Sequence, residues 1–284
     1  MLRYAYNTNG CTHYRLQDAI QIMHVNGYQG IALTLDWHHL DPFGTHWEYE
    51  ARGLSDTLAS LQMSSVIETG ARYLLSTTKH APTLLHPTRE GRNLRIRFLK
   101  RAIDIAAILG SETVSFWAGI CPENITRKQA LLFLKEGLEE ICAYAEKKNI
   151  ILSFEPEPGM LIETISEYKE LCTHISEDLH LALDIGHVWV TGEMNPKDAV
   201  AMHASHCGTF SVEGMQQGVH VHLPLDQGNM DVRTIIHELI RQEFTKLVCV
   251  ELSRESHRAH LAIPESIAML REWEAAYVPQ NEHA

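Results

Sequence analysis

An acidic residue and a histidine follow an apolar run in the segment LHLALDIGHVWV (179–190), where Asp184 and His187 are three positions apart. One interpretation is that the pair ends an ordinary buried strand, with Asp184 bonding nearby backbone in the turn. The other is that the carboxylate and the imidazole belong to a metal or proton-transfer site. The two residues alone do not separate these interpretations, so the choice depends on partners from other segments.

Two glutamates follow apolar runs of the same kind. Glu155 comes directly after IILSF and Glu251 directly after LVCV. Strands of a parallel sheet are buried on both faces, and a buried carboxylate is costly unless a cation or a metal compensates it. We therefore interpret both glutamates as functional.

Two histidines alternate with valines in the segment GVHVHLPL (218–225). On a strand, His220 and His222 would point to the same side. One of them is expected to bind a metal and the other to contact the substrate or support the site, and the spacing does not choose between them. Together with Glu155, Asp184 and Glu251 they form an oxygen-rich set. Such a set favours one divalent ion, Mn²⁺, Mg²⁺ or Co²⁺ before Zn²⁺.

The elements that must position these residues alternate between short β-type runs and amphipathic helical stretches. This alternation predicts an α/β fold with a parallel sheet, and eight strands close most simply as a single (β/α)₈ barrel over residues 1–277, followed by a polar tail, 278–284. A doubly wound open sheet is the alternative, but YNTNGCTHY after the first strand lacks its glycine-rich turn. The expected strands are LRYAYNT at the start and segments 30–36, 64–70, 113–119, 150–157, 179–184, 218–225 and 246–253.

In such a barrel the site lies at the C-terminal ends of the strands. The second, third and fourth strands are then followed or ended by Asp36, Glu68 and Trp117. Trp37 and Trp117 could stack on the apolar faces of a sugar, or simply cover the rim of the barrel. Asp36 fits an ordinary turn residue as well as a site residue.

The composition limits the function classes. The chain has 284 residues, a formal net charge of −12 and 45% hydrophobic residues. The negative charge opposes binding to nucleic acid, and no apolar run is long enough for a membrane span. The six cysteines form no Cys-x-x-Cys pair, so we expect them to be reduced, and without an export signal we expect a cytoplasmic protein.

The segments SFEPEPG, ALDIGH, VHVHLPLDQGNMD and CVELS resemble, along essentially the whole chain, the xylose-isomerase-like barrels. This family includes sugar isomerases and epimerases, inosose dehydratases and endonuclease IV enzymes. The resemblance to its ketose 3-epimerases implies a one-metal site. In that site Glu155, Asp184, a strand-seven histidine and Glu251 are the ligands. The family's His-x-His-Asp pattern favours His220 as the metal ligand and leaves His222 facing the substrate.

The same resemblance implies further roles. Glu155 and Glu251 would exchange protons with a substrate carbon, His187 would touch a substrate oxygen, and Arg233 stands where epimerases place a substrate-binding arginine. Leu223 replaces the aspartate of the family's strand-seven pattern, and Glu157 is the nearest counterpart of a second substrate-contacting glutamate. Homodimers and homotetramers are common among the relatives.

These residues predict a divalent-metal-dependent isomerase or epimerase of a small sugar, polyol or related carbonyl compound. The reaction would pass through a metal-chelated enediolate, with the paired glutamates exchanging the proton and Glu68, Trp37 and Trp117 contacting the substrate. A metal-dependent dehydratase shares the first step and is the main alternative. An endonuclease IV-like phosphoesterase is disfavoured because the third and fourth strand ends carry Glu68 and Trp117 instead of histidines, and Asp231-Val-Arg233 stands in place of Asp-x-His. A non-catalytic pathway protein with a vestigial metal site is the last alternative.

Overall fold

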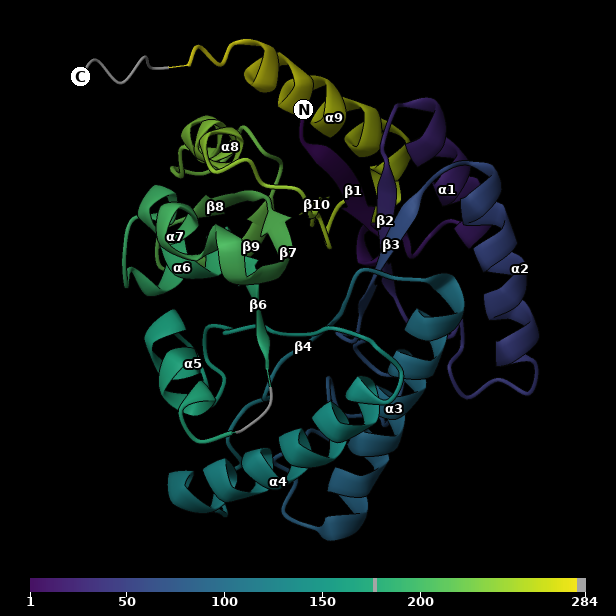
Figure 1. Cartoon of the computed structure of the whole chain (residues 1–284), viewed down its shortest axis with the longest axis vertical. Helices are drawn as coiled ribbons and strands as arrows, with labels where there is room; N and C mark the ends of the chain where they lie inside the picture. The colour runs from purple at the N-terminus through teal and green to yellow at the C-terminus, as the bar shows by residue number, and fades with distance from the viewer. Residues whose placement is uncertain (176–177, 280–284) are drawn as a thin grey trace.

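Eight parallel strands form a closed barrel in the computed structural model, which describes residues 1–175 and 178–279 (Figure 1). Around the barrel, β10 lies between β1 and β7, and the other neighbours follow chain order. The predicted (β/α)₈ barrel is therefore confirmed. Its strands are β1 (Arg3–Asn7), β2 (Gly30–Thr34), β3 (Ser64–Glu68), β4 (Val114–Phe116), β5 (Leu152–Phe154), β6 (His180–Asp184), β7 (Cys207–Val212) and β10 (Leu247–Val250).

Helices surround the barrel, with α3 and α4 lying side by side (Figure 1). Local signals set their ends: Thr126 and Gln129 form a reciprocal capping box at the start of α4, and Gly110 ends α3 in a left-handed conformation with φ 64°. The helices are α1 (Leu16–Val25), α2 (Trp47–Ser60), α3 (Arg89–Leu109), α4 (Arg127–Glu146), α5 (Ile165–Cys172), α6 (Ile185–Thr191), α7 (Pro196–His203), α8 (Val232–Arg241) and α9 (Ala259–Ala275).

Apolar side chains fill both faces of the strands. On β1, Tyr4 and Tyr6 belong to the large core cluster, whereas Ala5 between them belongs to a second cluster of small and medium side chains from β1, β2, β3 and β10. Because successive strand residues point to opposite faces, the second cluster fills the barrel interior and the first packs the strands against the helices.

The predicted seventh strand is wrong. The seventh barrel strand is β7, formed by the segment CGTFSV, which the sequence pattern placed at or just after a helix. Residues 219–223 instead form β9 (Val219–Leu223), which pairs antiparallel with β8 (Gly214–Gln216) in a hairpin outside the barrel. The apolar alternation of VHVHL fits a half-solvated hairpin as well as a barrel strand, and for this reason the pattern was misleading.

The last helix, α9, begins at Ala259, and Pro264 lies inside it. The domain boundary at residue 277 stays a prediction, and most of the predicted tail lies outside the described residues, which end at 279. Within the described part of the chain, none of the helices combines the length and the apolar character needed to cross a membrane.

Candidate active site

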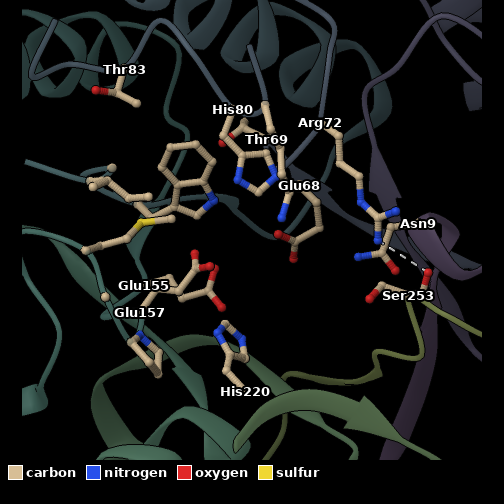
Figure 2. A pocket seen from close by; sticks show the side chains of 18 of the residues that line it. Asn9, Glu68, Thr69, Arg72, His80, Thr83, Glu155, Glu157, His220 and Ser253 are labelled. Atoms are coloured by element: carbon tan, nitrogen blue, oxygen red, sulfur yellow. Dashed lines mark hydrogen bonds between the residues drawn. The ribbon is translucent and has the colours of Figure 1, made fainter. Parts of the chain in front are cut away.

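A cavity of about 630 Å³ opens at the C-terminal ends of the strands. Seven of the predicted site residues line it, and Figure 2 shows Glu68 and Arg72 across the cavity from Glu155 and Glu157. The barrel topology brings these segments together from distant parts of the chain. The predicted site residues that line the cavity are Glu68, Trp117, Glu155, His187, His220, His222 and Glu251.

Asp184 is the last residue of β6, as predicted, and is buried. Its Oδ1 accepts a hydrogen bond from the backbone N–H of His187 at 3.0 Å, which caps the first turn of α6. Its Oδ2 lies 3.6 Å from Nε2 of His187 and has no hydrogen-bond partner among the described residues. The Asp-x-x-His pair therefore both ends the strand and leaves one carboxylate oxygen free for chemistry.

The orientation of the His187 ring fixes which nitrogen carries the hydrogen. Nδ1 lies 3.1 Å from the backbone oxygen of Pro156, which can only accept, so Nδ1 donates and Nε2 carries the lone pair. Nε2 faces Nε2 of His220 at 3.1 Å. Burial lowers the pKa of His187, and burial with the neighbouring His187 and His222 lowers the pKa of His220 to about 4. Both imidazoles are therefore neutral near pH 7.

Carboxyl groups crowd the base of the cavity. Burial, followed by the charge of nearby acids, raises the pKa of Glu68 and of Glu155 well above the usual value, and raises that of Glu157 to about 8. Oε1 of Glu251 accepts a hydrogen bond from the Asn9 side-chain amide at 2.8 Å. Such a set favours binding of a proton or a cation.

Glu213 is the acidic residue that the sequence prediction missed. It follows β7 directly, it is 0% exposed, and β7 lies between β6 and β10 in the barrel. Burial, and then the charge of Asp184, raise its pKa well above the usual value. The signal was weaker than for Glu155 and Glu251, because the acid follows a short, partly polar segment (TFSVE) that was not recognised as a strand.

The side chains fit a divalent cation. Within the described residues, three overlapping groups each bring one possible ligand atom per residue within 4.8 Å of one another. Several of the atoms in these groups are buried without a hydrogen-bond partner, including Oδ2 of Asp184 and both carboxylate oxygens of Glu213. The groups are Glu155, Asp184 and His187; Asp184, Glu213 and His222; and His187, His220 and His222.

Two predicted substrate contacts lie away from the cavity. Trp37 is 67% exposed, and Arg233 is exposed on α8; neither lines the cavity. The side chain of Asp36 accepts a hydrogen bond from the backbone N–H of Trp37 at 2.8 Å, as a turn residue does. The structure gives no support to substrate contacts by Trp37 and Arg233.

Trp117, in contrast, is a fixed wall of the cavity. It is 4% exposed, and the guanidinium of the buried Arg95 lies 4.4 Å from its ring centroid. Arg95 is itself held because its Nη2 donates to the backbone oxygen and to Oγ1 of Thr69. His80 lies on the ring as well, at 5.2 Å between centroids. A cation over an indole face holds the ring in one orientation.

Comparisons with known proteins agree with this fold. A family model described as a xylose isomerase-like TIM barrel matches residues 20–273. The comparison with curated protein sequences gives no match.

Similar solved structures have low sequence identity to this chain. An L-ribulose 3-epimerase has a TM-score of 0.77 and 15% identity, covering 100% of both chains. A probable 3-DHS dehydratase of Bacillus anthracis, involved in petrobactin synthesis, has a TM-score of 0.76 and 16% identity over 95% of this chain and 99% of its own. The IOLI protein, solved with a zinc atom, has a TM-score of 0.75 and 15% identity over 98% of this chain and 100% of its own. At such identities the likeness shows the fold alone.

Proposed function

The chain belongs to the xylose isomerase-like TIM barrel family, and from this premise we propose that it is a divalent-metal-dependent isomerase or epimerase of a small sugar, polyol or related carbonyl compound. The observation that carries the proposal is that Glu155 and Glu251, from the fifth and eighth barrel strands, line one cavity together with a neutral His187. The epimerases among the similar structures are consistent with this activity.

The cation would be held by Glu155, Asp184 and Glu251 together with a histidine of the hairpin, for which the family pattern favours His220. Bound there, it would supply positive charge that makes the C–H beside a carbonyl more acidic and offsets the negative charge that develops on the oxygen. The unpartnered Oδ2 of Asp184 supports a cation at this place.

The two glutamates would transfer the proton. One of them removes it from the substrate carbon beside the carbonyl, and the other returns a proton to the same carbon or to its neighbour. His187 carries the lone pair on Nε2, which faces Nε2 of His220 in this structure; with substrate bound, it would instead accept the hydrogen of a substrate hydroxyl and orient that oxygen. Trp117 would pack against the apolar C–H face of the substrate, and Glu68 would hydrogen-bond to a hydroxyl.

A dehydratase is the second candidate, and Glu157 favours it. This glutamate lines the cavity, and its pKa is raised to about 8 by burial and by the charges of Glu251 and Asp184. A carboxyl that is protonated near neutral pH could donate its proton to a leaving hydroxyl, so that water departs after the same first step. The solved 3-DHS dehydratase shares the fold.

The test is exchange of substrate hydrogen with solvent. The purified chain is stripped with a chelator, reloaded separately with Mn²⁺, Mg²⁺, Co²⁺ or Zn²⁺, and incubated in D₂O with a panel of ketoses, inososes and hydroxy acids. We expect metal-dependent loss of one C–H signal in the NMR spectrum, accompanied by an epimer or an aldose–ketose pair. A dehydrated product would favour the lyase instead. Absence of metal binding and of exchange across the panel would contradict both and favour a non-catalytic protein.

A further inference from the structure

Four buried polar atoms of three neighbouring side chains have no complementary donor or acceptor among the described residues, although the carboxyls of Asp184 and Glu213 lie close enough to share one hydrogen. They are Oδ2 of Asp184, both carboxylate oxygens of Glu213 and Nδ1 of His222. Their residues form one of the groups whose candidate ligand atoms lie within 4.8 Å of one another. An unpartnered buried polar atom destabilises the fold, and a charged one does so more strongly. Four such atoms in one place indicate that these side chains can bind a common partner.

A proton could satisfy only part of this group. If Glu213 were protonated, its hydroxyl could donate to Asp184, which would satisfy one oxygen of each carboxyl. The second oxygen of Glu213 would then gain a donor only if Nδ1 of His222 carried the ring hydrogen. A divalent cation can instead accept an electron pair from all three side chains at once when Nδ1 of His222 carries the lone pair, and the two arrangements therefore require opposite tautomers of His222.

The position of Glu213 in the barrel is the second line of support. In the sheet register Val212 pairs with Val250, so Glu213 and Glu251 follow neighbouring strands at the same level. On the other side, Asp184 ends β6 opposite Ser211 of β7. Glu213 therefore stands between two proposed metal ligands, at the strand end where the family resemblance places a histidine. The hairpin that follows it, β8–β9, supplies the imidazoles.

We propose that Asp184, Glu213 and His222 bind a divalent cation, with Glu213 as the ligand from the seventh barrel strand and His222, rather than His220, as the imidazole ligand. This inference rests on the proposed metal site: it adds Glu213, which the sequence did not assign, to the predicted ligand Asp184 and chooses His222 from the two histidines that the sequence left open. Two carboxylates and one imidazole suit Mn²⁺, Co²⁺ or Zn²⁺, whereas Mg²⁺ prefers oxygen ligands alone. His220 is then free to face His187 and the cavity.

The experiment measures metal affinity without substrate. Chelator-stripped protein is titrated with Mn²⁺, and free Mn²⁺ is followed by its EPR signal, with Zn²⁺ measured by competition. Glu213→Gln and His222→Gln should each weaken binding by at least ~10-fold, the lower bound seen when even a residue that only supports a ligand is removed. Two variants serve as matched controls. Glu157→Gln removes a cavity carboxyl that belongs to none of the three groups of possible metal ligands, and His220→Gln removes the imidazole two residues before His222 on β9. Both should change the affinity by less than ~3-fold, about 0.6 kcal/mol.

Thermal unfolding separates a ligand from a structural residue. Glu213→Gln removes a buried acid beside Asp184, so the metal-free variant should unfold at the same or a higher temperature than the metal-free wild type, and its gain in Tm on adding Mn²⁺ should be smaller. A lower metal-free Tm with unchanged metal affinity would mean that Glu213 is structural and would overturn the inference. A loss of affinity in His220→Gln but not in His222→Gln would overturn the choice of imidazole.

Failure of the proposed function is distinguishable from failure of this inference. If the wild type binds Mn²⁺ and the variants behave as expected, but no compound of the panel exchanges hydrogen, the ligand assignment is supported and the isomerase assignment is contradicted. If exchange depends on metal but Glu213→Gln and His222→Gln bind Mn²⁺ as tightly as the wild type does, the proposed function is supported and the ligand assignment is contradicted.

Discussion

Gly186 makes room for Glu213. A Cβ atom on Gly186 would lie 1.9 Å from Oε1 of Glu213 and 2.5 Å from the terminal methyl of Met215. Gly186 is not among the residues with positive φ, so the glycine is needed here for close approach and not for an unusual backbone conformation. The turn after Asp184 and the end of the seventh strand are thus packed against each other through a position without a side chain.

Gly186→Ala should disturb this contact. The added methyl must displace the Glu213 carboxyl or shift the backbone, which we expect to cost about 1–3 kcal/mol in the free energy of unfolding and to weaken Mn²⁺ binding. Urea denaturation and metal titration check both effects. Gly53→Ala on α2 is the control, because a Cβ there meets nothing within 4 Å, and it should leave metal affinity unchanged and stability equal or higher. Wild-type stability and metal affinity in Gly186→Ala would contradict the prediction.

Glu155→Gln and Glu251→Gln should each lower the rate of hydrogen exchange with solvent by about 10²–10⁴-fold, because a positioned general base or acid contributes that much. If one glutamate removes the proton and the other returns it, the variant without the second glutamate can still exchange hydrogen without forming product. The variant without the first glutamate loses both hydrogen exchange and product formation. The measurement is NMR in D₂O for exchange and for product in the same sample. Exchange retained at the wild-type rate in both variants would remove the glutamates from the mechanism.

The metal-free protein should show the titration of Glu157. Its pKa rises from 4.5 in the unfolded chain to about 8 in the fold, so the folded state holds the proton more tightly. The stabilising contribution of this group is full below about pH 4.5 and is lost as the pH rises toward about 8. The free energy of unfolding of Glu157→Gln relative to the wild type should therefore increase across this window.

Urea denaturation at several pH values in the presence of a chelator measures that difference. Histidines with lowered pKa values, such as His220, make the free energy of unfolding rise with pH, because their neutral form is favoured in the fold. This contribution is the same in both proteins, so it cancels when the two free energies are subtracted. A difference that stays constant, or that falls with rising pH, would show that the pKa of Glu157 is not raised in the fold.

Substrate affinity should depend on Trp117 and not on Trp37. Trp117→Leu removes a cavity wall held by Arg95 and should raise KM roughly tenfold, equivalent to about 1.4 kcal/mol. Trp37→Leu and Arg233→Gln alter residues outside the cavity and should leave KM within about twofold of the wild type. Steady-state kinetics with the substrate found in the exchange screen is the measurement. An equal rise in KM for Trp37→Leu would mean that the loop after β2 covers the bound substrate.

The barrel itself was predictable because βα alternation is a local pattern repeated along the whole chain. The ends of the third, fifth, sixth and eighth strands could be found in the same way, since each places Glu68, Glu155, Asp184 or Glu251 at the close of an apolar run. A buried strand that ends in an acid is a pattern of consecutive residues, so it can be recognised in the sequence without tertiary information.

The seventh strand was not predictable in this way. CGTFSV is short and moderately polar, whereas VHVHL has the stronger alternation of apolar and polar residues. Only strand pairing shows that β7 lies between β6 and β10 and that VHVHL forms a hairpin outside the barrel. Because VHVHL was taken as the seventh barrel strand, His220 and His222 were predicted at a barrel strand end and Glu213 was not predicted as a site residue.

The sequence by itself determined the barrel, the acids that close its strands and the Asp184–His187 pair. Tertiary structure decided which side chains meet: it placed Glu213 against Asp184, turned Nε2 of His187 toward His220, buried Arg95 behind Trp117 and left Trp37 and Arg233 outside the cavity. The physical reason is that a strand is specified by neighbouring residues, whereas the free energy of a charge depends on groups that are distant in the chain and adjacent only after folding.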